Sequence, residues 1–491
     1  MKKIRINYIY FLIGAIPILF YIFGVFYDNI RFNNGLGFDG ATYGYYVKEC
    51  IVQNINNYYA HRILPSLITK LFLNIFNIVP TDETIFTTFH ILNIVFFTFS
   101  IVLFFKISQK TNMSLKRSYF VITLVFFNFF FLKNAPFYPV LTDYSAFFLS
   151  TLLLYSYIFN KPILTFFCFL SGVLTFPTIA PMVFVLFFVK KNNSIQAHNN
   201  LLTRLIIWMQ KKRVITIVIY LIPLIYAYLA LRLLFVWIPD ISNYYFWSTE
   251  KLNIIISIIS MITNVLVLIT LLYTYSNYLQ KKLITISKEW DTNLSYLFIL
   301  ISCLILIETI LKYFVINPEI QSPTNSIKLI ETILLMSVQR PLLAIFSHIF
   351  HWGGLVIISL IFYKKIIENA EKYGYGMLLL LMMHSVLFIF ISETRLLIGF
   401  LPFLAFLTAI SIPENVLSTN FLAIHSIISV IISRFWLKFD DLGISSDINL
   451  DSWYFLGGPW TKDKGYFILA IVSIILFLVY GLLTKKNLKT L

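Results

Sequence analysis

Long apolar runs separated by short polar segments make up most of the chain. The first run covers residues 7–27, and runs of similar length recur as far as residue 484. An apolar run of about 20 residues is long enough to cross the hydrocarbon core of a bilayer as a helix. The pattern therefore predicts an all-α fold, a polytopic transmembrane helix bundle with about 11–13 spans.

The expected spans follow from taking the N-terminus as cytoplasmic and alternating sides. They cover 7–27, 85–105, 118–132, 143–159, 214–236, 254–277, 294–314, 341–363, 376–392, 396–411, 421–437 and 466–484. The outer segments are then 28–84, 237–253, 315–340, the short turn Glu393–Arg395, and 438–465. Lys and Arg are denser in the cytoplasmic segments, in agreement with the positive-inside rule. The whole chain is thus expected to be one membrane domain with both termini in the cytoplasm.

The apolar run at 162–189 does not fit this alternation, because basic segments follow it as well as precede it. It also contains Pro177 and Pro181, and proline breaks a helix by removing a donor and clashing with the preceding turn. We therefore expect a pair of half-helices that enters the membrane and returns. Such irregular backbone is tolerated at membrane depth where protein shields it or where it faces a cavity.

Composition supports a membrane protein and excludes several other classes. Of the 491 residues, 59% are hydrophobic and 12% are charged, and the mean hydropathy is +0.83, whereas soluble domains carry about a quarter charged residues. The net charge of +16 comes from Lys and Arg beside the apolar runs, so we expect no nucleic-acid partner. Three cysteines provide no disulfide framework. The first run lacks a small-residue cleavage site and is expected to stay as a helix.

The first outer segment, 28–84, is too polar for a span and too amphipathic for a plain linker. It contains "GFDGATYGYYVKEC" and, further on, "AHRILP". Short amphipathic helices rich in aromatic residues, as expected near Tyr43 and after Arg62, lie in the membrane interface. Asp39 would then lie at the level of the outer headgroups, near His61 and Arg62. The alternative is that Asp39 only begins a helix as its cap.

A second acidic position follows Pro139 in "FYPVLTDYSAFFL". Asp143 stands there at the outer end of the span expected at 143–159. A carboxylate at a helix start is favoured by the helix dipole, which is the structural interpretation. A charged group at the edge of a membrane cavity is also costly and is often kept for work on a substrate.

These residues resemble those of the C-type (GT-C) polytopic membrane glycosyltransferases. Many bacterial members have one helix, then a long outer loop with a "DG…Y" pattern and later an "R-x-L-P" turn. Here Asp39-Gly40 and Tyr43 are followed by Arg62-Ile63-Leu64-Pro65. Pro139 and Asp143 match the turn and the acidic residue before the fourth helix. Leu174-Thr175-Phe176-Pro177 is similar to a later "L-T-R-P" motif but lacks its basic residue.

The resemblance implies transfer of a sugar from a polyprenyl-phosphate donor to a glycan or lipid acceptor at the outer face. Asp39 would be the general base or would hold the acceptor hydroxyl. Arg62 and His61 would contact phosphate or sugar, because the guanidinium fork matches phosphate geometry. Asp143 and Tyr43 would line the same cavity. No cofactor is required by the sequence, and dependence on a divalent metal stays open.

Other positions provide weaker candidates for substrate contacts. Arg340 could contact a lipid phosphate or could be a snorkelling structural arginine. Glu393 and Arg395 could reach the cavity or form only a local ion pair. His348 and His351 share a helix face, but without a third ligand they are expected to be packed histidines and not a metal site.

Two other classes of membrane protein remain as alternatives. A polysaccharide polymerase or a flippase of surface glycan assembly would also be polytopic and would lack transferase chemistry of its own. A secondary transporter is disfavoured because no internal repeat is visible. In all these cases the protein would contact membrane lipids, and we expect it in the cell membrane, as a multi-pass protein of the bacterial inner membrane.

Overall fold

The chain folds almost entirely into helices. The computed structural model describes residues 2–49, 55, 57–191, 214–237, 253–292, 294–317, 326–438, 458, 461 and 463–488. Most of the outer segment expected at 438–465, and most of that at 237–253, lie outside the described residues.

The helices up to residue 188 are α1 (Lys2–Tyr27), α2 (Phe38–Lys48), α3 (Asn57–Ala60), α4 (Leu64–Ile75), α5 (Asp82–Lys110), α6 (Leu115–Phe126), η1 (Phe130–Asn134), α7 (Ala135–Phe137), α8 (Asp143–Ile158), α9 (Pro162–Val173) and α10 (Ile179–Phe188). The later helices are α12 (Val214–Arg232), η2 (Leu233–Trp237), α13 (Ile254–Glu289), α14 (Leu294–Ile310), η4 (Leu311–Val315), α15 (Ser326–Val338), α16 (Leu343–Trp352), α17 (Gly354–Ile361), α18 (Tyr363–Tyr373), α19 (Tyr375–Phe390), η5 (Thr394–Phe400), α20 (Leu401–Ser411), α21 (Thr419–Ile432) and α22 (Asp463–Leu488). Two short strands, β1 (Val189–Lys191) and β2 (Trp290–Thr292), pair antiparallel with Val189 opposite Thr292.

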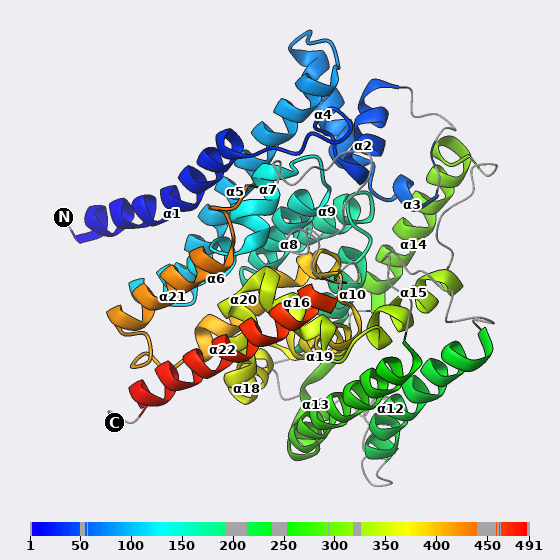
Figure 1. The fold of residues 1–491 in the computed structure, drawn as a ribbon, viewed down its shortest axis with the longest axis vertical. Coiled ribbons are helices and arrows are strands. Elements are labelled where there is room, and N and C mark those ends of the chain that lie inside the picture. Colours follow the sequence, from blue (N-terminus) through cyan, green and yellow to red (C-terminus); the bar gives the residue numbers. More distant parts are fainter. Residues whose placement is uncertain are drawn as a thin grey trace.

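Several of these helices are long and apolar enough to cross a membrane. Five qualify among the described residues, or seven if each of two sharply bent helix pairs is counted as one span. The five are Asp82–Lys110, Ile254–Leu279, Leu297–Val315, Thr394–Ser411 and Asp463–Lys485. The prediction of an α-helical, multi-pass membrane protein is therefore confirmed. Figure 1 shows both termini on the left of the view, and α2, α3 and α4 gathered at the upper right.

One continuous apolar core runs through the centre of the molecule. It is built from buried side chains of α5, α6, α8, α10, α19 and α20, among others. Aromatic rings fill much of it; Phe97, for example, contacts Phe131 edge to face with ring centroids 5.0 Å apart. Such edge-to-face contacts between rings are favourable beyond their burial. The helices that carry the polar residues described below are therefore fixed by dense packing behind them.

Residues 341–363 differ from the prediction of one continuous helix. The segment divides into α16 and α17 at Gly353, whose φ is +59°. Glycine adopts this left-handed conformation without the steric cost that a side chain brings. The preceding segment, expected as an outer loop, contains helix α15. The bend between the end of this helix and α16, measured over Glu331–Val338 and Leu343–Trp352, is 89°. Apolar length alone does not reveal such breaks.

Residues 162–189 form the two short helices α9 and α10, joined by a turn at 174–178. The tip of this hairpin reaches the chain that follows α3, because Leu64 N donates to Leu174 O at 2.9 Å. The other end of α9 adjoins the end of α8, where Lys161 N donates to Ser156 O at 2.9 Å. The hairpin therefore extends along α8 from one end to the other and back.

A buried ion pair fastens the end of α1 to the bent segment after α6. Lys133 of η1 donates to Asp28, and both side chains are at most 3% exposed. Lys133 also donates to Leu437 O at 2.5 Å. Removing one partner of such a pair leaves an uncompensated buried charge and costs about 3–5 kcal/mol. The π-helical form of η1, in which one extra residue widens the helix, brings Lys133 to this position.

Candidate functional site

The start of α2 lies directly on the segment that leads into α8. Gly40 N donates to the hydroxyl of Tyr138 at 2.9 Å. A Cβ at Gly40 would lie 2.8 Å from Val140 O, and a Cβ at Gly37 would lie 2.4 Å from the Tyr138 ring. The absence of side chains at these two positions permits this close approach. As a result, Asp39 lies near Asp143, and the two motifs singled out in the sequence belong to one site.

Asp39 does not cap α2. The residue at the N-cap position is Gly37, and no side-chain cap bond is formed there. Asp39 is the second residue of the helix, and its carboxylate points to partners outside it. Arg395 Nη1 lies 3.0 Å from Asp39 Oδ2, and the Tyr59 hydroxyl donates to Asp39 Oδ1 at 3.4 Å.

Arg395 joins two carboxylates at the start of η5. Besides Asp39, it contacts Glu393 through Nε. The Glu393 side chain is 6% exposed, whereas those of Asp39 and Arg395 are 24% and 28% exposed. The local ion pair considered from the sequence therefore exists, and the same guanidinium also reaches the first outer segment. Neighbouring Thr394 is held from α16, because His348 Nδ1 lies 2.9 Å from its hydroxyl.

Arg62 is buried between two aromatic rings after α3. Its guanidinium carbon lies 4.7 Å from the centre of the Tyr58 ring and 4.8 Å from that of Phe176, at the tip of the α9–α10 hairpin. Such cation–π contacts stabilise a guanidinium that is largely removed from water. Its Nε has no hydrogen-bond partner among the described residues. The aromatic rings thus position this cation and leave a donor for another group.

Asp143, the first residue of α8, is 1% exposed. It lies within electrostatic range of Arg395, Arg62, Asp39 and Glu393. In the described part of the chain its Oδ1 accepts no hydrogen bond. A buried carboxylate oxygen without a donor is costly, which distinguishes Asp143 from a simple helix-start residue. We refer to Asp39, Arg62, Asp143, Glu393 and Arg395 as the charged cluster.

Tyrosines surround the charged cluster. Tyr43 is 1% exposed, and the charges of Arg62 and Asp39 act on it. Burial, and next the negative charge of Asp39, raise the pKa of Tyr59 to about 12. Its hydroxyl therefore stays protonated at neutral pH and serves as a donor to Asp39. Sequence reasoning did not single out Tyr58 or Tyr59, although both lie in the aromatic segment just before His61.

Two predicted site residues have partners outside the charged cluster. His61 Nε2 lies 3.6 Å from Glu308 Oε2 on α14. Arg340, 6% exposed, lies 2.9 Å from Asp463 Oδ1 at the start of α22 and donates to Thr461 O. A structural role is therefore supported for Arg340. Within the described residues no group of three or more His, Cys, Asp or Glu side chains is placed to hold a metal ion.

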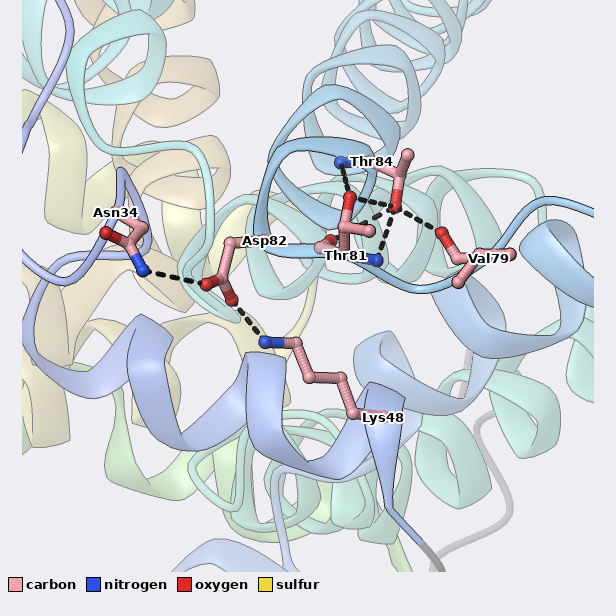
Figure 2. Close-up of polar contacts among 6 residues, drawn as sticks. All are labelled: Asn34, Lys48, Val79, Thr81, Asp82 and Thr84. Carbon is pink, nitrogen blue, oxygen red and sulfur yellow. Dashed lines mark hydrogen bonds and ion pairs between the residues drawn. The ribbon is translucent and has the colours of Figure 1, made fainter.

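A salt bridge at the other end of α2 from Asp39 holds this helix against α5. Lys48 Nζ lies 2.5 Å from Asp82 Oδ1, and Asn34 Nδ2 donates to Asp82 Oδ2 at 3.0 Å (Figure 2). Figure 2 also shows the Thr81–Thr84 capping box that begins α5. The Lys48 and Asp82 side chains are 35% and 25% exposed, so this pair contributes at most about 1 kcal/mol. Asp82 is thus a carboxylate near α2 that does not belong to the charged cluster.

The charged cluster draws its members from segments far apart in the chain: α2, the turn after α3, the start of α8, and η5. It contains one more carboxylate than guanidinium, and Arg62, Asp143 and Glu393 are buried. Charged groups removed from water in a membrane protein are costly and often serve a function. Comparison with models of protein families, with curated proteins and with solved structures finds no match to this chain. What the protein does is therefore inferred from the chemistry of the charged cluster.

Proposed function

We propose that this protein is a membrane glycosyltransferase that moves a sugar from a polyprenyl-phosphate donor to a glycan or lipid acceptor at the outer face of the membrane. The observation that carries the proposal is the ion pair between Asp39 and Arg395, 3.0 Å long, with Arg62 and Asp143 beside it. Carboxylates beside arginines, at one end of an apolar helix bundle, suit a reaction between a hydroxyl and a lipid phosphate ester.

In the proposed reaction, the acceptor hydroxyl attacks the anomeric carbon of the donor sugar. Asp39 takes the hydroxyl proton as the new C–O bond forms. The bond between the anomeric carbon and the phosphate oxygen breaks, and the oxygen leaves with the electron pair as polyprenyl phosphate. Arginine forks stabilise the charge that grows on this phosphate.

Arg62 and Arg395 would have different roles. Arg62 is held between Tyr58 and Phe176, and its Nε has no hydrogen-bond partner in the described part of the chain, so it is our candidate for the donor phosphate. Arg395 is shared by Asp39 and Glu393. An incoming phosphate would compete with Asp39 for Arg395. Binding of the phosphate would free the Asp39 carboxylate to act as the base. Tyr43, whose side chain acts on Arg62, and His61, the residue before Arg62, are our candidates for further substrate contacts.

The architecture belongs to the same proposal. The GT-C-like fold, a total of about 11–13 spans, cytoplasmic termini and a bacterial inner membrane are parts of it. The spans beyond those that qualify by length would come from shorter apolar helices, such as Leu12–Tyr27 and Tyr375–Phe390.

The test is an Asp39→Asn variant, assayed in membranes for sugar transfer from polyprenyl-phosphate donors. We expect the rate to fall by about 10²–10⁴-fold, the usual contribution of a general base. Asp82→Asn is the matched control, because it also removes a carboxylate with a cationic partner near α2. Full activity of Asp39→Asn at a normal protein level would refute the role of Asp39. No transfer by the unchanged protein with any donor would favour a polymerase or flippase.

A further inference from the structure

A cavity lies between α13 and α18, away from the charged cluster. Its volume is about 310 Å³, and its lining includes Tyr273, Asn277 and Tyr278 of α13 and Lys364, Ile367 and Glu368 of α18. A cavity of this size is at the small end of ligand-binding pockets. It is large enough for a headgroup but not for a whole lipid.

The cavity lies near the opposite end of the bundle from the charged cluster. Helix α8 begins at Asp143 in that cluster, and near its other end the Tyr157 hydroxyl donates to Tyr373 O of α18 at 2.9 Å. Helix α20 likewise follows η5, and at its end Ser411 accepts from Asn369 of α18 at 3.0 Å. A helix of 16 residues such as α8 is about 24 Å long. The two sites would therefore meet opposite leaflets.

The cavity presents one cation and one anion. Lys364 and Glu368 are exposed and one helical turn apart on α18, so their Cβ atoms are separated by about 6 Å. Neither forms an ion pair within the part of the chain that the structure describes. The neighbouring Glu371, by contrast, already accepts a hydrogen bond from Tyr278. Lys364 and Glu368 are thus two opposite charges whose spacing suits a zwitterion.

The surface that leads to the cavity is apolar. Ile259, Ile262, Leu266 and Tyr273 follow one face of α13 and are 49–59% exposed. The buried Ile367 gives the cavity an apolar wall. Tyrosine rings beside a lysine are typical of the level at which phospholipid headgroups lie. The apolar face of α13 would therefore accept an acyl chain whose headgroup occupies the cavity.

We propose that this cavity binds the phosphoethanolamine headgroup of a phospholipid in the leaflet opposite the charged cluster. Lys364 binds the phosphate and Glu368 accepts from the ammonium, while the acyl chains follow α13. An anionic glycerol headgroup would be repelled by Glu368, and a choline headgroup offers no N–H donor to it.

The experiment measures lipid retention on the purified full-length protein by native mass spectrometry. Phosphatidylethanolamine, phosphatidylglycerol and phosphatidylcholine are added in detergent at equal concentrations, and soluble phosphoethanolamine is added separately. We expect preferential retention of phosphatidylethanolamine and no measurable binding of soluble phosphoethanolamine. Equal retention of the three lipids would overturn the proposal, and binding of the soluble headgroup as tightly as the lipid would overturn the part assigned to the acyl chains.

Variants test the two charges separately. Lys364→Met should weaken phosphatidylethanolamine binding by about tenfold, the value of a charge-assisted hydrogen bond. Glu368→Gln should remove the preference for phosphatidylethanolamine over phosphatidylglycerol. Lys365→Met is the matched control, since Lys365 is the next residue, is also exposed and does not line the cavity. An equal loss in Lys365→Met would refute a specific site and indicate only general attraction to α18.

Discussion

The contact between Asp39 and Arg395 conflicts with the proposed role of Asp39 as a catalytic base. Arg395 Nη1 lies 3.0 Å from Asp39 Oδ2, whereas a base needs a carboxylate oxygen that can face the acceptor hydroxyl. Exchange of Arg395 from Asp39 to a phosphate would resolve this conflict. The resting ion pair would then be a state that the donor displaces.

Arg395→Lys tests whether the guanidinium fork matters. Lysine keeps the charge but cannot contact Asp39 and Glu393 with two fixed donors, as Arg395 does. We expect transfer activity to fall by about tenfold or more, with the protein level unchanged. Arg117→Lys is the control, because Arg117 also contacts a carboxylate, Glu414, and a carbonyl, Ile412 O. Equal activity of Arg395→Lys and the unchanged protein would contradict the proposed movement of Arg395 from Asp39 to the donor phosphate.

Tyr59→Phe removes the hydroxyl donor to Asp39. The 3.4 Å bond is long, so we expect a loss of only about 0.5–1.5 kcal/mol, or a few-fold in rate. The pKa of Tyr59 is raised to about 12, so the donor is fully present below the unfolded value of about 10 and is lost only as the pH rises toward 12. The rate ratio of the two proteins should therefore be constant between about pH 6 and 9. A ratio that changes across this range would mean that Tyr59 titrates there.

At this scale the sequence identified individual residues better than their partners. Asp39, Arg62 and Asp143 stood out because charged groups beside apolar runs are costly. Lys133, inside the apolar "FFLKNAPF", carried the same signal and was overlooked. The partners of His61 and Arg340, Glu308 and Asp463, are remote in the chain, and no local pattern links them.

Among the elements, α2 shows how a helix places a functional group without capping it. Gly37 has a φ of +76°, which turns the chain sharply into the helix. Gly40 then allows the helix to lie on Val140 O. The direction of Asp39 is thus set by the contact of two backbones.

Gly40→Ala should disturb this contact. The added Cβ would lie 2.8 Å from a backbone oxygen that cannot rotate away, so α2 must shift. We expect a loss of about 1–3 kcal/mol in stability and a larger loss of transfer activity, measured by thermal unfolding in detergent and by the membrane assay. In the control Gly44→Ala, the Cβ meets the Leu36 Cδ1 atom at 2.7 Å, the end of a side chain that can change rotamer. Equal effects of the two changes would contradict this view of α2.

Element types were predictable where the apolar pattern was long and uninterrupted. The runs at 85–105 and 143–159 correspond to α5 and α8, and the prolines near 177 marked the turn between α9 and α10. The break at Gly353 was missed, since an isolated glycine in an apolar run is common and only the φ of +59° makes it a helix end. Helix α15 was missed because its sequence is mixed in polarity.

For the whole molecule, the orientation in the membrane can be tested by labelling. Single cysteines at Asn34 and Lys110, in a background with the three native cysteines replaced by serine, would report it. Both residues are exposed, and they lie at opposite ends of α5. We expect the cysteine at 34 to react with a membrane-impermeant maleimide in intact cells and that at 110 only after permeabilisation. The reverse labelling would place the charged cluster in the cytoplasm and exclude an outer-face reaction.

The distribution of the charged cluster along the chain has a consequence for biosynthesis. Asp39, Arg62 and Asp143 leave the ribosome early, whereas Arg395 follows only after most of the remaining helices. Lys133 likewise meets Asp28 early but gains Leu437 O near the end of synthesis. Nascent chains fold from the N-terminus. The first helices are therefore in the bilayer before the Arg395 partner of Asp39 has been synthesised. A chain that stops before η5 lacks the Arg395 partner of Asp39, so quality control would distinguish unfinished copies from finished ones by this unpaired carboxylate.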